Sequence, residues 1–266
     1  TSLASISIPS TVKELGTRSF SACSQLNNIS LSSGLEIMGD YCFSGCSSIE
    51  EITIPSSVLI LGNYCFSGCT KITSMSLPSG VTQIGEFCFN ECIALESLQV
   101  PSELNALPSS FISGCKKLIS FTIPETVTSL GSKCFSGCFI EELRIPQSVT
   151  NVSGDFLDKN PNIKGIEFGA NINYIPTVYE NQQRITAGCF VDCKALESVI
   201  ITSPITKLPD YCFKECLALK KVSIPNSVTS LGNCCFTNCQ SLTDFSIPES
   251  VKTIGGACFF KCKSIK

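Results

Sequence analysis

Apolar residues recur along this chain with a regular period. Ile-Pro pairs such as those beginning at Ile8 and Ile54 occupy one slot of the repeat, numbered zero below, and Leu31 fills the same slot between them. Copies of this slot are evenly spaced, except that one unit lacks a residue and another carries a ten-residue insertion. A fixed period of about 23 residues indicates a repeat architecture. The sequence therefore predicts about eleven 23-residue units forming a single domain over residues 1–266, with the insertion at about residues 177–186.

Each unit contains a short segment in which apolar and small polar residues alternate. Slots −2 and zero are apolar and slots −3 and −1 are polar, as in Ser-Ile-Ser-Ile at residues 5–8. A period of two predicts a short strand with one buried face. The proline at slot +1 has no N–H group to donate, so we expect it at the end of the strand.

The second half of each unit has its own recurring slots. Glycine is frequent at slot +8, phenylalanine at +12 and cysteine at +15. The segment from +9 to +14 is predicted to form a short helix or turn. One strand and one return segment cannot bury their apolar residues alone, but stacked copies can. The fold class that follows is an α/β-type repeat solenoid with a parallel β-sheet.

Nineteen cysteines, many in C-x3-C pairs such as Cys42 and Cys46, raise three possibilities: a metal array, a disulfide framework or a packing device. Free cysteine behaves as a small hydrophobe, and the +11 slot also accepts Ser19 and Phe111, which favours packing. The spacing differs from the C-x2-C of many zinc sites and no histidine assists. Disulfide bonds between neighbouring coils remain a possibility, because a spacing of about 4.8 Å lies within the range that a disulfide permits.

Composition excludes several classes of function. The net charge is −3 and only 15% of residues are charged, so no basic stripe is available for nucleic acid. No apolar run approaches the roughly 18 residues of a transmembrane segment. The chain has no histidine, which removes the usual general base and a common metal ligand. We expect neither enzymatic activity nor a cofactor or bound metal.

The motif IPSSVLILGNYCFSGC at residues 54–69, which recurs along the chain with the period described above, resembles the leucine-rich repeat family named after the bacterial surface protein BspA. Cysteine at +11 resembles the Cys-rich versions of parasitic amoebae and trichomonads. The resemblance implies a right-handed, curved array with its parallel sheet on the concave face. It also implies non-enzymatic adhesion or protein binding at a cell surface, with a host or matrix protein as partner. Because both chain ends fall within a repeat, we expect an excerpt of a longer array.

Two places on the predicted array offer binding groups. The first is the sheet face, where the outward slots −3 and −1 are mostly serine and threonine, with a few charged residues. The second is the insertion, which should protrude from its coil. It supplies aromatic and guanidinium groups typical of binding hot spots. The candidate binding residues are Glu51, Glu142, Arg144 and Lys221 on the sheet, and Tyr174, Tyr179, Gln182 and Arg184 around the insertion.

Two functions remain open. The first is recognition or adhesion at the cell surface, which the family resemblance favours. The second is an intracellular, cytoplasmic scaffold or regulatory subunit that binds a partner enzyme. The many thiols and the absence of a signal peptide at the first residues favour the second.

Overall fold

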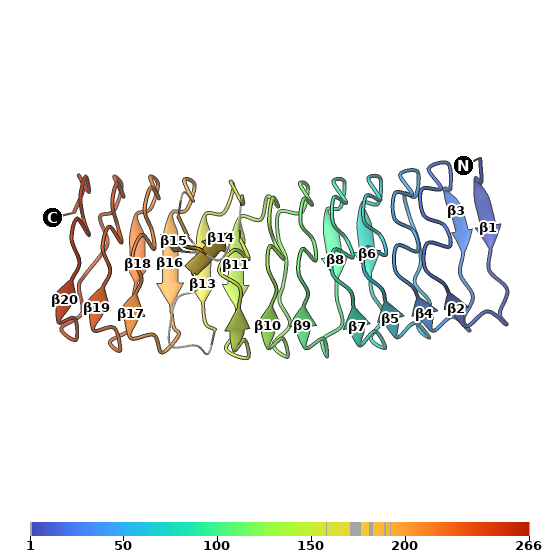
Figure 1. Ribbon diagram of the computed structural model, residues 1–266, viewed down its shortest axis with the longest axis horizontal. Helices are drawn as coiled ribbons and strands as arrows, with labels where there is room; N and C mark the ends of the chain where they lie inside the picture. Colours follow the sequence, from blue (N-terminus) through green and yellow to red (C-terminus); the bar gives the residue numbers. More distant parts are fainter. Residues whose placement is uncertain are drawn as a thin grey trace. The chain divides into compact units, whose positions relative to one another are not determined.

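The structure, a computed structural model, describes residues 2–157, 159–170, 177–180, 183–188, 190–191 and 193–265. The chain divides into two compact units, Thr1–Phe139 and Ile140–Lys266 (Figure 1). In each unit the chain winds as a stack of coils. The single-domain organisation and the count of eleven repeats stay predictions.

The first unit contains two files of short strands. In the first file, β1 pairs with β3 and β6 with β8; in the second, β2, β4, β5 and β7 pair in that order and β9 pairs with β10. The strands are β1 Ser5–Ser7, β2 Glu14–Leu15, β3 Asn28–Ser30, β4 Ile37–Met38, β5 Ile60–Leu61, β6 Ser74–Ser76, β7 Gln83–Ile84, β8 Ser97–Gln99, β9 Ala106–Leu107 and β10 Ser129–Leu130.

The second unit repeats both files and adds a hairpin. Its first file is the sheet β11-β13-β16-β18, its second file includes β17-β19-β20, and β14 pairs with β15. The strands are β11 Glu142–Ile145, β12 Asn151–Val152, β13 Gly165–Phe168, β14 Thr177–Glu180, β15 Gln183–Gly188, β16 Ser198–Ile201, β17 Lys207–Leu208, β18 Lys221–Ser223, β19 Ser230–Leu231 and β20 Thr253–Ile254.

The strand register follows the sequence period. Ile6 pairs with Ile29, and Met38 pairs with Leu61, both in parallel and both one repeat apart in the sequence. Identical slots therefore lie side by side in neighbouring coils. The parallel solenoid predicted from the sequence is confirmed, and so are the first-file strands with one buried face, for example β8 with Leu98 inward and its neighbours outward.

The second strand file, at slots +6 and +7, was not predicted. Its strands are only two residues long, too short to produce an alternating pattern. They end where Gly62 occupies slot +8. A Cβ atom at Gly62 would lie 2.5 Å from the backbone nitrogen of Asp40 in the preceding coil, so glycine permits the close approach of the two coils.

The α/β label is not confirmed, because the residues that the structure describes contain no helix. In the return segment, Tyr64 and Gly68 have positive φ angles of 56° and 72°, which a right-handed helix cannot contain. The N–H groups of Tyr64, Phe66 and Gly68 donate to carbonyl groups of the next coil. Those of Ser67 and Cys69 donate three residues back in the same coil. The segment therefore forms turns, the second of the two predicted alternatives, because the N–H groups of Tyr64, Phe66 and Gly68 bond between coils instead of within a helix.

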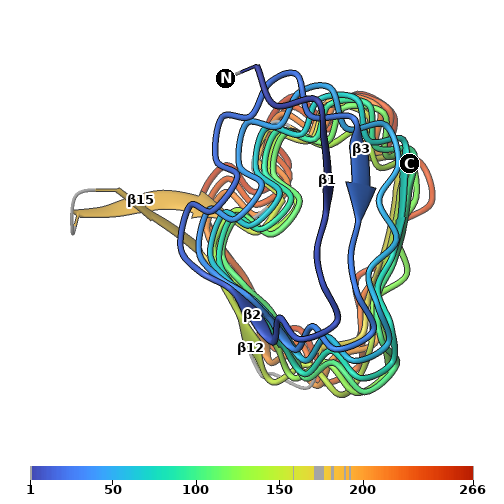
Figure 2. The same cartoon turned by 90° about the vertical axis from the view of Figure 1, so that its right-hand side faces the viewer.

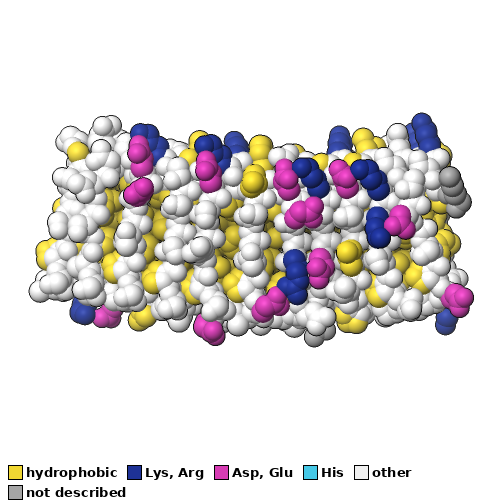
Figure 3. All heavy atoms as spheres, turned by 180° about the vertical axis from the view of Figure 1, so that it is seen from behind, with side chains coloured by type: hydrophobic (Ala, Val, Ile, Leu, Met, Phe, Trp, Pro, Cys, Tyr) yellow, Lys and Arg dark blue, Asp and Glu magenta, His cyan; other side chains and the backbone are white. Residues whose placement is uncertain are grey.

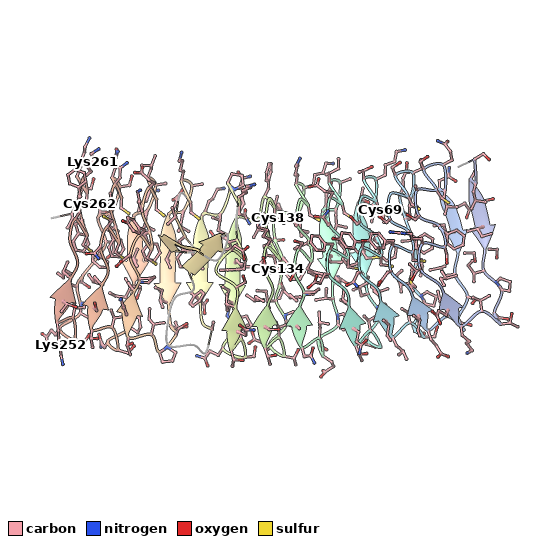
Figure 4. The ribbon with its side chains drawn as sticks, in the orientation of Figure 1. Cys69, Cys134, Cys138, Lys252, Lys261 and Cys262 are labelled. Atoms are coloured by element: carbon pink, nitrogen blue, oxygen red, sulfur yellow. The ribbon has the colours of Figure 1, made fainter. Side chains whose placement is uncertain are left out.

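The core is built from files of phenylalanine and cysteine. Phe43 and Phe66 stack with ring centroids 5.7 Å apart and an angle of 8° between their planes. Every cysteine among the described residues is a free thiol, and only Cys234 and Cys262 are not buried. Figure 4 locates Cys69, Cys138 and Cys262, which belong to the +15 file. The packing function predicted for the cysteines agrees with this burial.

The inserted residues form the antiparallel hairpin β14–β15, with a register shift between Val178 and Tyr179. The hairpin interrupts the return segment of its coil. In Figure 2 it projects outward from the coils of its own unit. Surface loops tolerate insertions better than the elements that they connect.

Candidate protein-binding surfaces

The outer face of the sheet β11-β13-β16-β18 holds three of the predicted binding residues. Glu142 and Arg144 lie on β11 and Lys221 lies on β18, all with exposed side chains. They point outward because the intervening slot −2 residues, such as Leu143 and Val222, are buried. The alternation read from the sequence positions these three residues correctly.

Ion pairs between neighbouring strands hold most of the charges on this face. Arg144 Nε lies 3.4 Å from Glu167 Oε1, and Lys221 Nζ lies 3.1 Å from Asp244 Oδ2. All four side chains are about half exposed or more. Exposed pairs of this kind contribute about 0–1 kcal/mol each to stability. Their main effect is to fix where each charge lies on the face.

A second charged row runs beside the sheet at slot −4. Lys164 Nζ lies 3.0 Å from Glu141 Oε2, and Lys220 Nζ lies 2.7 Å from Glu197 Oε2. The hydrogen bond and positive charge of Lys220 lower the pKa of the Glu197 carboxyl group, despite slight desolvation, and Lys164 adds to the effect. The row is therefore a series of alternating charges that neutralise one another.

One apolar side chain stands among these charges. Ile200 on β16 is 43% exposed, and its neighbours across the sheet are Glu167 and Ser223. On the two neighbouring strands β11 and β13, the carboxylate of Glu142 lies over the bare backbone of Gly165. Figure 3 views this face and shows charged side chains of both signs gathered over the strands of the second unit. The sheet thus offers an exposed apolar group inside a polar rim.

The same face of the first unit is mainly uncharged. Ser74, Ser76 and Ser97 are exposed on β6 and β8. Glu51 is exposed at slot −3. The predicted site residues therefore divide between the two units, with most of the charge in the second.

The insertion residues do not join the sheet residues in one surface. Tyr179 and Arg184 are register partners in the hairpin. The hairpin belongs to the return segment of the coil rather than to the first strand file, and projects outward from it (Figure 2). Tyr174 and Gln182 lie outside the described residues.

The buried thiols are poor nucleophiles. Burial, with a contribution from Cys46, raises the pKa of Cys42 to about 12, and burial raises that of Cys92 to about 12. Both thiols are protonated at neutral pH, whereas the thiolate is the reactive form. The described part of the chain contains no group of three or more side chains able to hold a metal ion. Nor does that part include a helix that could cross a membrane.

Sequence reasoning missed a surface file of aromatic side chains at slot +10. Tyr41, Tyr64 and Phe87 occupy this slot in three consecutive coils of the first unit, after Arg18 in the preceding one. Their rings stack 4.6 and 4.5 Å apart and are nearly parallel. Aligning the repeats at slot +10 would have revealed the file, because equivalent slots lie side by side.

Comparison with known proteins identifies the repeat. A family model described as "BspA type Leucine rich repeat region (6 copies)" matches residues 1–119, 88–181 and 177–266. No protein with a curated description matches the chain.

Solved structures of bacterial proteins have the same fold. A leucine-rich repeat protein from Bacteroides ovatus ATCC 8483 is 25% identical, with a TM-score of 0.70, over 98% of this chain and 76% of that one. One from Eubacterium ventriosum ATCC 27560 is 19% identical, with a TM-score of 0.53, over 97% and 82%. A leucine-rich cell surface protein from Faecalibacterium prausnitzii A2-165 is 21% identical, with a TM-score of 0.51, over 99% and 78%.

Proposed function

Because the chain belongs to the BspA-type leucine-rich repeat family, we propose that it is a non-enzymatic module that binds another protein. The observation that carries this proposal is the outer face of β11-β13-β16-β18. There Ile200, 43% exposed, stands among charges whose positions are fixed by the strand register. An apolar group inside a polar rim is the usual anatomy of a protein interface.

We assign Glu142, Arg144 and Lys221 to this interface. Arginine is enriched among the residues that dominate binding energy, and Arg144 pairs with Glu167, which is the neighbour of Ile200 across the sheet. Tyr179 and Arg184 on the hairpin form a separate candidate contact, as does Glu51 on the first unit.

The location that we propose is the cell surface, with a host or matrix protein as partner, in keeping with the family resemblance. The cell-surface protein of Faecalibacterium prausnitzii is similar to this chain in fold alone. An intracellular scaffold is the second candidate, and the free thiols favour it, since unpaired cysteines are typical of reducing compartments.

Binding is tested by replacing Ser198, at the centre of the sheet, with a photoreactive amino acid and irradiating the protein together with host cells and extracellular matrix. We expect one specific cross-linked protein. Its binding to the purified full chain should weaken at least about tenfold, or 1.4 kcal/mol, in Ile200→Ser/Arg144→Ala. The matched control carries the photoreactive group at Ser97 in the first unit. Equal cross-linking from both positions would contradict a site on the second sheet.

An antibody against the chain decides the location. Labelling of intact cells would support a surface protein. Labelling only after permeabilisation would support the scaffold and direct the search to cytosolic partners.

A further inference from the structure

The packing of the coil does not require aromatic residues at slot +10. Tyr41, Tyr64 and Phe87 are only partly buried, and their φ angles are 56°, 56° and 57°. Bulky residues rarely adopt this left-handed conformation. Ser110 and Lys133 occupy the same slot in the next two coils, with φ angles of 51° and 54°. The coil therefore accepts a small or charged side chain where these three coils carry rings.

The faces of the tyrosine rings are already covered. Tyr64 is stacked between Tyr41 and Phe87. The outer face of Tyr41 is covered by Arg18, whose guanidinium carbon lies 4.9 Å from the ring centroid. A ligand that binds by stacking, such as a nucleobase or a sugar, finds no free face on either tyrosine. What remains accessible on the tyrosines is a row of ring edges and hydroxyl groups.

A row of polar residues at slot +9 runs beside the rings and is acidic. Asp40 Oδ1 accepts a hydrogen bond from the backbone N–H of Asn63 at 2.7 Å, and Asn63 Oδ1 accepts one from that of Glu86 at 2.8 Å. These bonds align the row coil by coil. Desolvation raises the pKa of the Tyr64 hydroxyl group, and Tyr41 adds to this effect. The negative charge of nearby Glu86 raises the same pKa further.

The charges of this row differ from those of the second sheet. Within the described residues neither Asp40 nor Glu86 is part of an ion pair, whereas Arg144 and Lys221 each have a carboxylate partner. Two carboxylates without a cationic partner beside an aromatic edge favour a cationic ligand. The aliphatic stem of a lysine or arginine can pack on the ring edges while its charged end reaches a carboxylate.

A groove of about 390 Å³ borders the same row. Asp40 and Asn63 form part of its wall, and residues of β5, β7 and β9 and of the segments next to these strands form the rest, as far as Pro108. The groove crosses four coils, which at about 4.8 Å per step is roughly 14 Å. It is open along its length, so it suits four or five residues of extended chain.

The spacing of the two carboxylates selects the conformation of such a segment. Asp40 and Glu86 are two coils apart, or roughly 10 Å. In a polyproline II helix, with a rise of about 3.1 Å and three residues per turn, residues i and i+3 lie on one face about 9.3 Å apart. The rings stand beside the groove, which shares Asp40 and Asn63 with the slot +9 row.

We propose that the slot +10 rings, the slot +9 carboxylates and the adjoining groove of the first unit bind a polyproline II segment of a partner protein with positive charges three residues apart. This inference rests on the proposed function, because the partner is a protein. It concerns a different surface from the sheet of the second unit.

The test is a fluorescence-polarisation titration of the full-length chain with labelled (Arg-Pro-Pro)₄. Two peptides serve as controls: (Arg-Pro-Pro-Pro)₃, in which the charges are four residues apart, and (Glu-Pro-Pro)₄. We expect (Arg-Pro-Pro)₄ to bind at least about tenfold more tightly than either control. Equal binding of both arginine peptides, or no binding of (Arg-Pro-Pro)₄, would overturn the proposal.

Two double variants locate the site. Tyr41→Ser/Tyr64→Ser introduces the residue found at position 110 of the same slot, and Asp40→Asn/Glu86→Gln removes both charges while keeping the acceptor at position 40. Each should weaken binding of (Arg-Pro-Pro)₄ about tenfold or more with unchanged circular dichroism. Loss in the charge variant alone would refute the role of the rings.

Ile200→Ser distinguishes this inference from the proposed function. It should leave binding of (Arg-Pro-Pro)₄ unchanged while weakening binding of the partner protein to the sheet β11-β13-β16-β18. If peptide binding falls with Ile200→Ser and not with Tyr41→Ser/Tyr64→Ser, the assignment of the segment to the first unit is wrong.

Discussion

Cysteine at slot +15 combines small size with a weak hydrogen-bond donor. Cys46 Sγ lies 3.0 Å from the carbonyl oxygen of Phe20 in the preceding coil, and that oxygen also accepts the N–H of Cys23 at 3.1 Å. The same bond recurs from Cys69 to Phe43 at 3.2 Å. Alanine would fit the slot but lacks the donor. The thiol therefore links neighbouring coils in addition to filling space.

Asn160 is the exception in this file and predicts a point of weakness. It is 4% exposed, and neither polar atom of its side chain has a hydrogen-bond partner among the described residues. An unsatisfied buried polar group costs about 1–3 kcal/mol. Asn160→Cys should therefore raise the free energy of unfolding by about that amount, measured by urea denaturation. Asn160→Ala is the control and should gain less, because it leaves a cavity; a less stable Asn160→Cys protein would contradict this account.

At the scale of elements, the coil and the hairpin depend on different contacts. Coils are held by parallel pairing and by return-segment hydrogen bonds to the next coil. The strands β14 and β15 pair only with each other among the described residues. An isolated two-stranded hairpin is at most marginally stable in water. The hairpin is therefore an addition to the coil rather than part of its support.

Deleting Thr177–Gln183 should change the free energy of unfolding by less than about 1 kcal/mol, since loop closure depends only weakly on loop length. Thermal and urea denaturation measure the change. The matched control deletes seven residues that include β16, Ser198–Pro204, and should abolish cooperative folding. A stability loss of several kcal/mol in the first deletion would show that the hairpin packs on the coil.

At the scale of the whole molecule, the many buried thiols should make the folded protein less stable as the pH rises in the alkaline range. Burial, opposed by hydrogen bonds to backbone groups, raises the pKa of Cys138 to about 12, and burial raises that of Cys46 to about 11. An unfolded thiol has a pKa of about 8.5. Above that pH the unfolded chain releases protons that the folded chain keeps, so stability falls as pH rises.

Above pH 8.5, each buried thiol should lower the free energy of unfolding by up to about 1.4 kcal/mol per pH unit. This full slope should be reached about one pH unit above 8.5 and should persist until the pH reaches the pKa of the folded thiol. Below pH 8 the slope from this source should be near zero. Urea denaturation at pH 7.5, 8.5, 9.2 and 10 under reducing conditions measures it. A free energy of unfolding that stays constant from pH 8.5 to 10 would show that the thiols are accessible to water.

The pattern of residues along the chain was enough to predict the repeat, the parallel strands of the first file and the buried phenylalanine and cysteine slots. Stacking copies of one coil brings equal slots together, so a period in the sequence becomes a contact in space. The same alternation placed Glu142, Arg144 and Lys221 on one outer face.

The contacts between neighbouring coils become visible only in the folded chain. The return segment forms turns and not a helix because several of its donors bond to the next coil. The charges of Arg144 and Lys221 are paired because the next coils carry carboxylates at the facing positions. The file of Tyr41, Tyr64 and Phe87 likewise exists only when coils are stacked. A single repeat contains half of each of these contacts, and the other half lies one full period away in the sequence, in the neighbouring coil.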